Sequence, residues 1–92
     1  MVTIDEVWPR IVNCSGQSFT TKTGMAFTYA TPGQFLRVTR NGREVNRTLS
    51  RTNFERALAA MPAVGPSAIK DRQGSAYTWA FLMDPRVRQQ DW

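Results

Sequence analysis

The sequence predicts an α+β fold in which a mainly antiparallel β-meander of about six to seven short strands packs against one main helix at about residues 52–61. Turn signals recur at intervals of about 8 to 12 residues through the first half of the chain, which is the spacing of a meander. Apolar and polar residues alternate between these turns, as expected of strands with one buried face. An apolar stripe at helical spacing follows, and short helical turns are expected near both termini.

The first half of the chain contains most of the predicted strands. Thr3 and Glu6 have the spacing of a capping box for a short helical turn, which Pro9 is expected to end. Short apolar or β-prone segments follow at 11–14, 18–21 and 25–30, separated by glycine-containing turns. Within the last segment the side chains of Met25, Phe27 and Tyr29 share one face, which indicates a half-buried strand.

The strongest local signal is Asn41-Gly42, which lies between the apolar-rich segments 35–40 and 43–49. Both residues accept the positive φ that a two-residue type I′ hairpin requires. The register that follows places Arg40 opposite Arg43, Val38 opposite Val45 and Leu36 opposite Arg47, with Leu49 continuing that face. Two like charges are therefore expected to face each other at the hairpin tip.

The second half is expected to contain the main helix and the remaining strands. Thr52 and Glu55 have capping-box spacing, and an apolar helical stripe follows up to Pro62: Phe54, Ala57, Leu58 and Met61. Strands are predicted at 68–70 and 76–83, where large and small residues alternate. Tyr77 and Phe81 are also four residues apart, so a helical interpretation of 76–83 stays open. Asp84-Pro85 predicts the start of a C-terminal helical turn.

Composition indicates one small, basic domain spanning residues 1–92. Twelve Lys and Arg residues outnumber seven Asp and Glu residues, which gives a formal net charge of +5. Ten of the twelve are arginine, whose planar fork suits phosphate, although a GC-rich genome predicts the same bias without any function. No apolar segment approaches the length of about 20 residues that a transmembrane helix needs. The acidic start does not resemble a secretory signal, so a cytoplasmic and, from size and composition, prokaryotic protein is expected.

Residue types exclude several kinds of chemistry. The chain has no histidine, and therefore lacks the commonest general base and the main nitrogen ligand for metals. Its single cysteine, Cys14, provides neither an internal disulfide nor a zinc site. No nucleotide-binding or nucleophile motif is present, so no cofactor, no metal and no membrane partner are expected, and a catalytic role is not predicted. Arg, Glu and Tyr side chains can cleave RNA without histidine, which leaves an RNase-type toxin as a remote alternative.

The basic charge favours a nucleic-acid partner, with DNA as the first expectation. The arginines of the hairpin and of the following helix start are the predicted phosphate contacts: Arg37, Arg40, Arg43, Arg47, Arg51 and Arg56. An anion between Arg40 and Arg43 would offset their repulsion, whereas in the alternative view both side chains simply extend into water. A non-enzymatic protein-interaction or homo-oligomerising module, such as a homodimer that hides uncovered sheet surface, is the competing hypothesis.

Overall fold

The computed structural model describes residues 2–92, apart from the side chains of Asn46 and Arg47. Its sheet has four antiparallel strands in the order β1-β2-β3-β4, with bounds β1 Phe19–Thr20, β2 Ala26–Ala30, β3 Phe35–Arg40 and β4 Arg43–Ser50. The helices of the described residues are α1 Ile4–Asn13, α2 Arg51–Leu58, η1 Pro66–Ile69, α3 Ser75–Met83 and α4 Pro85–Arg88. The predicted α+β meander is confirmed, with four strands in place of six to seven.

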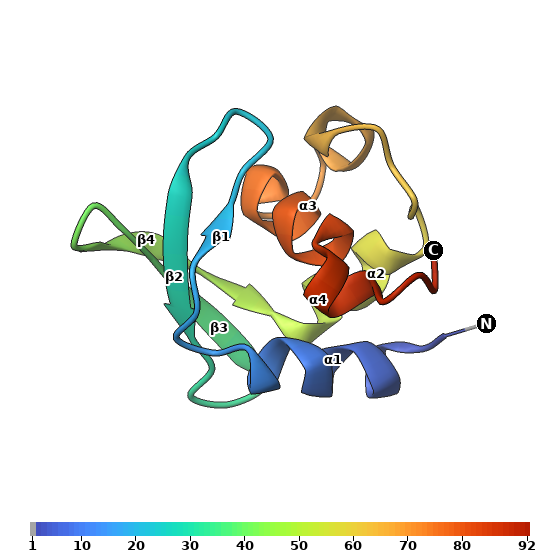
Figure 1. The fold of residues 1–92 in the computed structure, drawn as a ribbon, viewed down its shortest axis with the longest axis horizontal. Helices are drawn as coiled ribbons and strands as arrows, with labels where there is room; N and C mark the ends of the chain where they lie inside the picture. The colour runs from blue at the N-terminus through green and yellow to red at the C-terminus, as the bar shows by residue number, and fades with distance from the viewer. Residues whose placement is uncertain (1) are drawn as a thin grey trace.

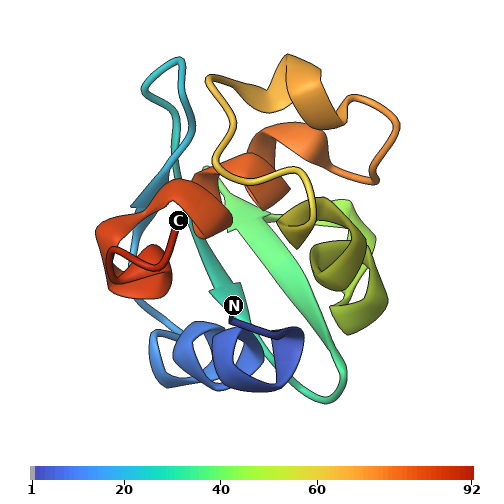
Figure 2. The same cartoon turned by 90° about the vertical axis from the view of Figure 1, so that its right-hand side faces the viewer.

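The helices cover one face of the sheet, and the core lies between the two layers (Figures 1 and 2). Phe81 of α3 occupies its centre. The ring of Phe81 lies 4.6 to 5.7 Å, centroid to centroid, from four other aromatic rings contributed by β1, β2 and α2: Phe19, Phe27, Tyr29 and Phe54. Tilted and edge-on aromatic pairs at such separations each stabilise a core by about 0.5–1.5 kcal/mol beyond the area they bury. This cluster therefore fixes α3 against the sheet.

The strands predicted at 68–70 and 76–83 are helical instead. Residues 76–83 belong to α3, and Ala68 and Ile69 belong to η1. The helix is buried on several sides at once, so its sequence carries no amphipathic period, and alternating large and small residues suit both geometries. Buried polar contacts that no local pattern reveals hold its start: the Asn53 amide donates to Thr78 Oγ1 and to the Gln73 carbonyl, both at 3.1 Å.

A glycine at the start of α3 meets two requirements. Gly74 has a positive φ of 55°, a region that side-chain-bearing residues rarely occupy. A Cβ at this position would also lie 2.8 Å from a methyl carbon of Leu49 on β4. Gly74 therefore allows the chain to turn into α3 while in close contact with the sheet.

The first two helices differ at their ends from the predictions. α1 continues through Pro9 to Asn13, because its buried face extends past the proline to Ile11, and Thr3 makes no side-chain capping bond. The main helix starts at Arg51 and ends at Leu58, since the Ser50 hydroxyl, in place of Thr52, accepts the capping bond from the Asn53 N–H at 3.1 Å. Predicted caps were misplaced because several adjacent residues have side chains able to cap.

The β3–β4 hairpin has the predicted turn but a different register beyond its tip. Arg40 pairs with Arg43 and Thr39 with Glu44, as expected, whereas Arg37 pairs with Thr48 and Leu36 with Leu49. From one matched pair to the next, β3 advances by two residues and β4 by four, so β4 contains an irregularity with two extra residues. An uninterrupted ladder would have placed Arg47 opposite buried Leu36. The insertion brings Leu49 there instead, and apolar side chains meet in the core.

The outer face of the sheet carries mostly small and polar side chains, together with the half-buried ring of Phe35, over which Arg37 lies. The exposed positions of β2 are Ala26, Thr28 and Ala30, and its buried positions, Phe27 and Tyr29, face the helices. Large exposed apolar side chains within the described residues are scattered over separate segments: Val12, Met25 and Val64. The uncovered apolar sheet surface expected under the oligomer hypothesis therefore has no counterpart in this part of the chain, although oligomerisation itself stays a prediction.

Candidate nucleic-acid interface

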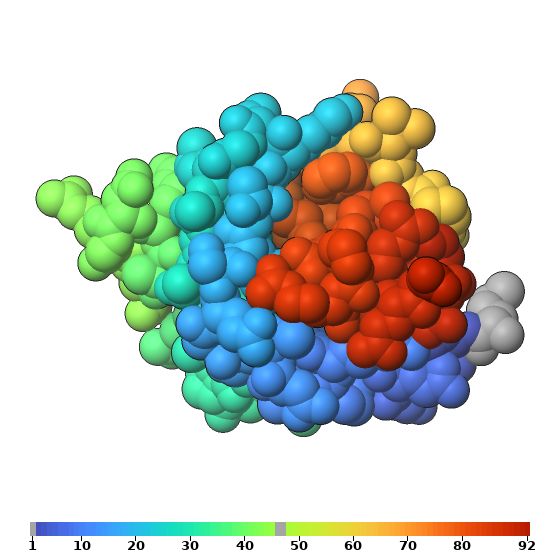
Figure 3. Space-filling view, in the orientation of Figure 1, coloured from blue at the N-terminus to red at the C-terminus, as the bar shows by residue number. Residues whose placement is uncertain are grey.

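The tip of the β3–β4 hairpin displays two arginines on one face. Asn41 and Gly42 have φ values of 54° and 75°, as a type I′ turn requires. Arg40 and Arg43 are directly paired across the two strands, and both are exposed. β2 pairs with β3 only as far as Thr39, so the tip extends past the last residue paired with β2, and it protrudes from the body of the molecule (Figure 3).

Arg40 is held in place by neighbours from two other segments. Its Nη1 lies 3.1 Å from the Tyr77 hydroxyl and 2.9 Å from the Met25 sulfur, and it donates to both. A guanidinium has five N–H donors, so three of them, at Nε and Nη2, remain for another acceptor. The fork that binds phosphate or a guanine edge is thus oriented by the protein and still available.

Tyr77 contacts the tip although it is not among the six arginines predicted as the site. It was predicted to lie in a core strand, but it stands on α3, half-buried, with its ring edge-on to Phe27 at 5.0 Å between centroids. Its hydroxyl accepts a hydrogen bond from Arg40 and keeps its own proton for a further acceptor. Residues 40 and 77 meet only through tertiary packing, so no local signal could have paired them.

No carboxylate neutralises the tip in the described part of the chain. Neither Arg40 nor Arg43 takes part in an ion pair there. The nearest acid in sequence, Glu44, belongs to the opposite face of the hairpin, where its carboxylate lies 3.8 Å from Arg37. Two like charges that face each other destabilise a hairpin, and within the described residues no carboxylate offsets this repulsion at the tip.

The other predicted phosphate contacts lie elsewhere. Arg37 is on the outer face of the sheet, paired with Glu44, and Arg51 at the start of α2 donates to Asp5 and to Gln34. Arg43 pairs with Arg40 and Ser50 with Phe35, so about five ladder steps, or about 17 Å at about 3.3 Å per step, separate Arg43 from the residue that precedes Arg51. Arg56 lines a separate shallow hollow with Arg72 and Asp71. The Arg47 side chain lies outside the described residues.

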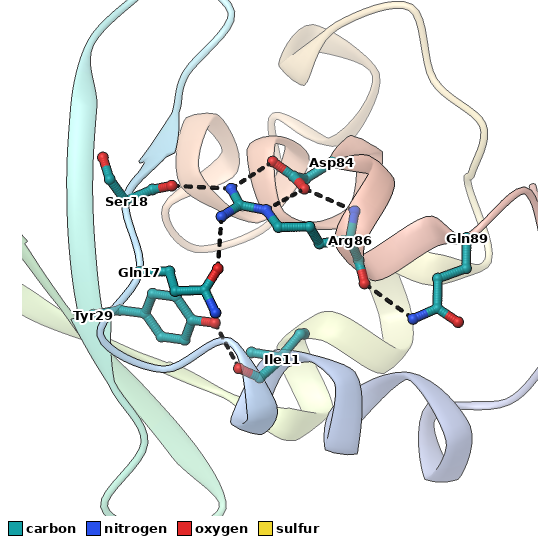
Figure 4. A network of polar contacts seen from close by, with 7 residues as sticks. All are labelled: Ile11, Gln17, Ser18, Tyr29, Asp84, Arg86 and Gln89. Carbon is teal, nitrogen blue, oxygen red and sulfur yellow. Dashed lines mark hydrogen bonds and ion pairs between the residues drawn. The ribbon is translucent and has the colours of Figure 1, made fainter.

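The contacts of Arg86, on α4 near the C-terminus, lie within the protein itself, and we call Arg86 with its partners the Arg86 cluster (Figure 4). The Arg86 guanidinium donates to both oxygens of Asp84, to Gln17 and to the Ser18 carbonyl, all at 2.9 to 3.0 Å. It also stacks at 3.8 Å over the ring of Phe19. These contacts fasten the segment before β1 to α4, so Arg86 has a structural role.

The buried tyrosine beside this cluster is also structural. The Tyr29 hydroxyl donates to the Ile11 carbonyl at 2.5 Å. Burial, aided by the neighbouring Cys14, raises the pKa of Tyr29 above its usual range. This group therefore stays protonated and joins β2 to α1.

Other kinds of site receive no support from the geometry. Within residues 2–92, no group of three or more His, Cys, Asp or Glu side chains is placed to hold a metal ion. None of the helices described is long and apolar enough to cross a membrane. Comparison with protein-family models, with curated proteins and with solved structures gives no match.

Proposed function

We propose that this protein is a nucleic-acid-binding domain that contacts its partner through the hairpin tip, with Arg40 and Arg43 as the principal contacts and Tyr77 in support. One observation carries the proposal: two exposed arginines are directly paired across the hairpin, without an acidic partner in the described residues. A phosphate oxygen placed between them would accept from both and from the Tyr77 hydroxyl. The net charge of +5 adds long-range attraction for a polyanion.

Binding is favoured over RNA cleavage because the tip lacks a proton acceptor. General acid–base catalysis needs a group within about 2.6–3.2 Å of the proton it moves. Glu44, the one acid of the hairpin, projects from the opposite face and pairs with Arg37. The Arg, Glu and Tyr constellation of a histidine-free RNase is therefore not assembled around Arg40 and Tyr77.

The proposal is tested by fluorescence anisotropy with labelled random DNA and RNA at about 50 and 200 mM salt, conditions between which phosphate contacts weaken strongly. We expect the Arg40→Ala, Arg43→Ala double variant to bind more weakly. The slope of log K against log salt should become shallower by about 1.8, because each lost phosphate contact contributes about 0.9. Both side chains are exposed, so urea denaturation should show an unchanged fold.

A matched control is provided by Lys22→Ala, Lys70→Ala, which removes two exposed cations away from the tip. Each double variant lowers the formal net charge from +5 to +3. If the tip is the site, the arginine variant loses far more affinity than the lysine variant. Equal losses would mean that charge alone attracts the nucleic acid, and no binding of any nucleic acid at 50 mM salt would refute the function.

A further inference from the structure

The aromatic side chains are placed so that they cannot serve a single strand well. Six of the ten aromatic side chains are buried and four are half-buried: Phe35, Tyr77, Trp79 and Trp92. Proteins that bind single strands stack bases on exposed rings, and each stacked base contributes about 1–3 kcal/mol. A single strand on this surface would be held by phosphate contacts alone.

The four half-buried rings already have partners. The Trp79 indole donates to the Ala63 carbonyl at 2.9 Å, and the Trp92 indole to the Leu82 carbonyl at 2.6 Å. Tyr77 packs edge-on against Phe27, and the guanidinium of Arg37 lies 5.7 Å from the centre of the Phe35 ring. These contacts fix the orientation of the four rings, and half-burial reduces the ring surface that a base could cover.

The shape of the tip suits the major groove of a duplex. Two paired strands lie about 4.8 Å apart, and the major groove of B-form DNA, about 12 Å wide and 8.5 Å deep, admits a two-stranded ribbon. The major groove of an A-form duplex is too deep and narrow for side chains to read. The tip extends beyond the last residue paired with β2 and carries no acidic residue between positions 40 and 43. It can therefore enter the major groove of B-form DNA and not that of an A-form duplex.

The side chains at the tip are of the types that contact base edges in that groove. Arginine donates in pairs to guanine O6 and N7, and asparagine pairs with adenine N6 and N7. Arg40 presents its unused Nε and Nη2 donors there, Arg43 stands across the ladder, and Asn41 is exposed at the apex. The outer-face ion pair of Arg37 and Glu44 stays on the far side of the ribbon.

Resting on the function proposed above, we infer that the partner is B-form duplex DNA and that residues 40–43 enter its major groove. The occupied aromatic rings argue against a single strand, and the width of the hairpin argues against an A-form duplex. Contact at base edges, in addition to phosphates, follows from the Arg40 donors that Tyr77 and Met25 leave unused.

The inference is tested with three probes of one sequence: a 16-base-pair DNA duplex, the corresponding RNA duplex and one DNA strand. Anisotropy at 50 mM salt should give at least tenfold tighter binding of the DNA duplex, and this preference should be lost in Arg40→Ala, Arg43→Ala. Methyl green, which occupies the major groove, should displace the protein from the DNA duplex, whereas distamycin in the minor groove should not.

The outcomes separate this inference from the function on which it rests. Equal or tighter binding of the single strand or of the RNA duplex, still dependent on Arg40 and Arg43, would overturn the duplex-DNA inference and leave the binding function standing. Displacement by distamycin and not by methyl green would overturn the major-groove placement. Absence of binding to all three probes, by wild-type protein that shows a cooperative urea transition, would overturn both.

Discussion

The hairpin tip and the Arg86 cluster show two different uses of the same side chain. The Arg86 guanidinium donates hydrogen bonds to Asp84, Gln17 and the Ser18 carbonyl and stacks on Phe19. Arg40 donates from Nη1 to Tyr77 and Met25, and its Nε and Nη2 donors remain unused. Within the described residues Arg43 has no carboxylate partner. The number of arginines therefore does not separate structural from unpaired guanidinium groups, whereas the partners of each one do.

The largest difference in stability between variants of the two regions should come from Arg86→Ala. This change removes charge-assisted hydrogen bonds and the stacking on Phe19, so we expect a loss of about 2–3 kcal/mol of unfolding free energy. Urea denaturation measures it. The Arg40→Ala, Arg43→Ala variant should stay within about 0.5 kcal/mol of the wild type, as surface substitutions usually do. Equal destabilisation by the two variants would contradict the assignment of structural and binding roles.

A smaller effect is expected at Asp84, which caps α4. Asp84 Oδ1 accepts from the Arg86 N–H at 2.9 Å, and an N-cap changed to alanine typically costs about 0.5–2 kcal/mol. Asp84→Ala should therefore cost about 1–2 kcal/mol, measured by urea denaturation. Asp84→Asn keeps the capping acceptor and should cost less. If the two variants were equally stable, the cap would contribute nothing.

The same residue predicts a dependence of stability on pH. Burial opposes ionisation of Asp84, but hydrogen bonds from the Arg86 side chain and backbone outweigh it and hold the pKa of Asp84 below its usual range. A carboxyl with a lowered folded-state pKa contributes stability above about pH 4, and that contribution is lost as the pH falls through the lower folded value. The urea midpoint should fall more steeply below pH 4 in the wild type than in Asp84→Asn. Parallel curves would contradict the shift.

The smallest expected effect concerns the hydrogen bond between Arg40 at the hairpin tip and Tyr77 on α3. Tyr77→Phe keeps the ring against Phe27 and removes only the hydroxyl that accepts from Arg40. A hydrogen bond contributes about 0.5–1.5 kcal/mol net, so DNA affinity should fall about threefold to tenfold with little change in stability. Anisotropy and urea denaturation measure the two quantities. Unchanged affinity would mean that Arg40 needs no support from α3.

The parts of this fold that the sequence predicted are those with local causes. The type I′ turn follows from two adjacent residues, Asn41 and Gly42, and the opposition of Arg40 and Arg43 follows from the turn. The α4 cap follows in the same way from Asp84-Pro85. Such features depend on a few neighbouring residues, which is why a single sequence contains them.

The parts that the sequence did not predict depend on distant contacts. Residues 76–83 alternate like a strand. They form a helix instead, which buries Phe81 among four aromatic rings from other segments. The extra residues in β4 are explained by the match of Leu36 with Leu49 in the core. Of the six arginines predicted as a site, Arg40 and Arg43 are paired at the hairpin tip, whereas Arg37 and Arg51 have acidic partners that folding brings to them.

The most direct test of the central claim is a titration of the ¹⁵N-labelled protein with duplex DNA, followed by amide chemical shifts. Perturbations concentrated on residues 39–44 and on Tyr77, with α4 and the start of α2 unmoved, are the predicted result. The largest perturbations on Arg51, Arg56 or α4, with the hairpin tip unchanged, would contradict it.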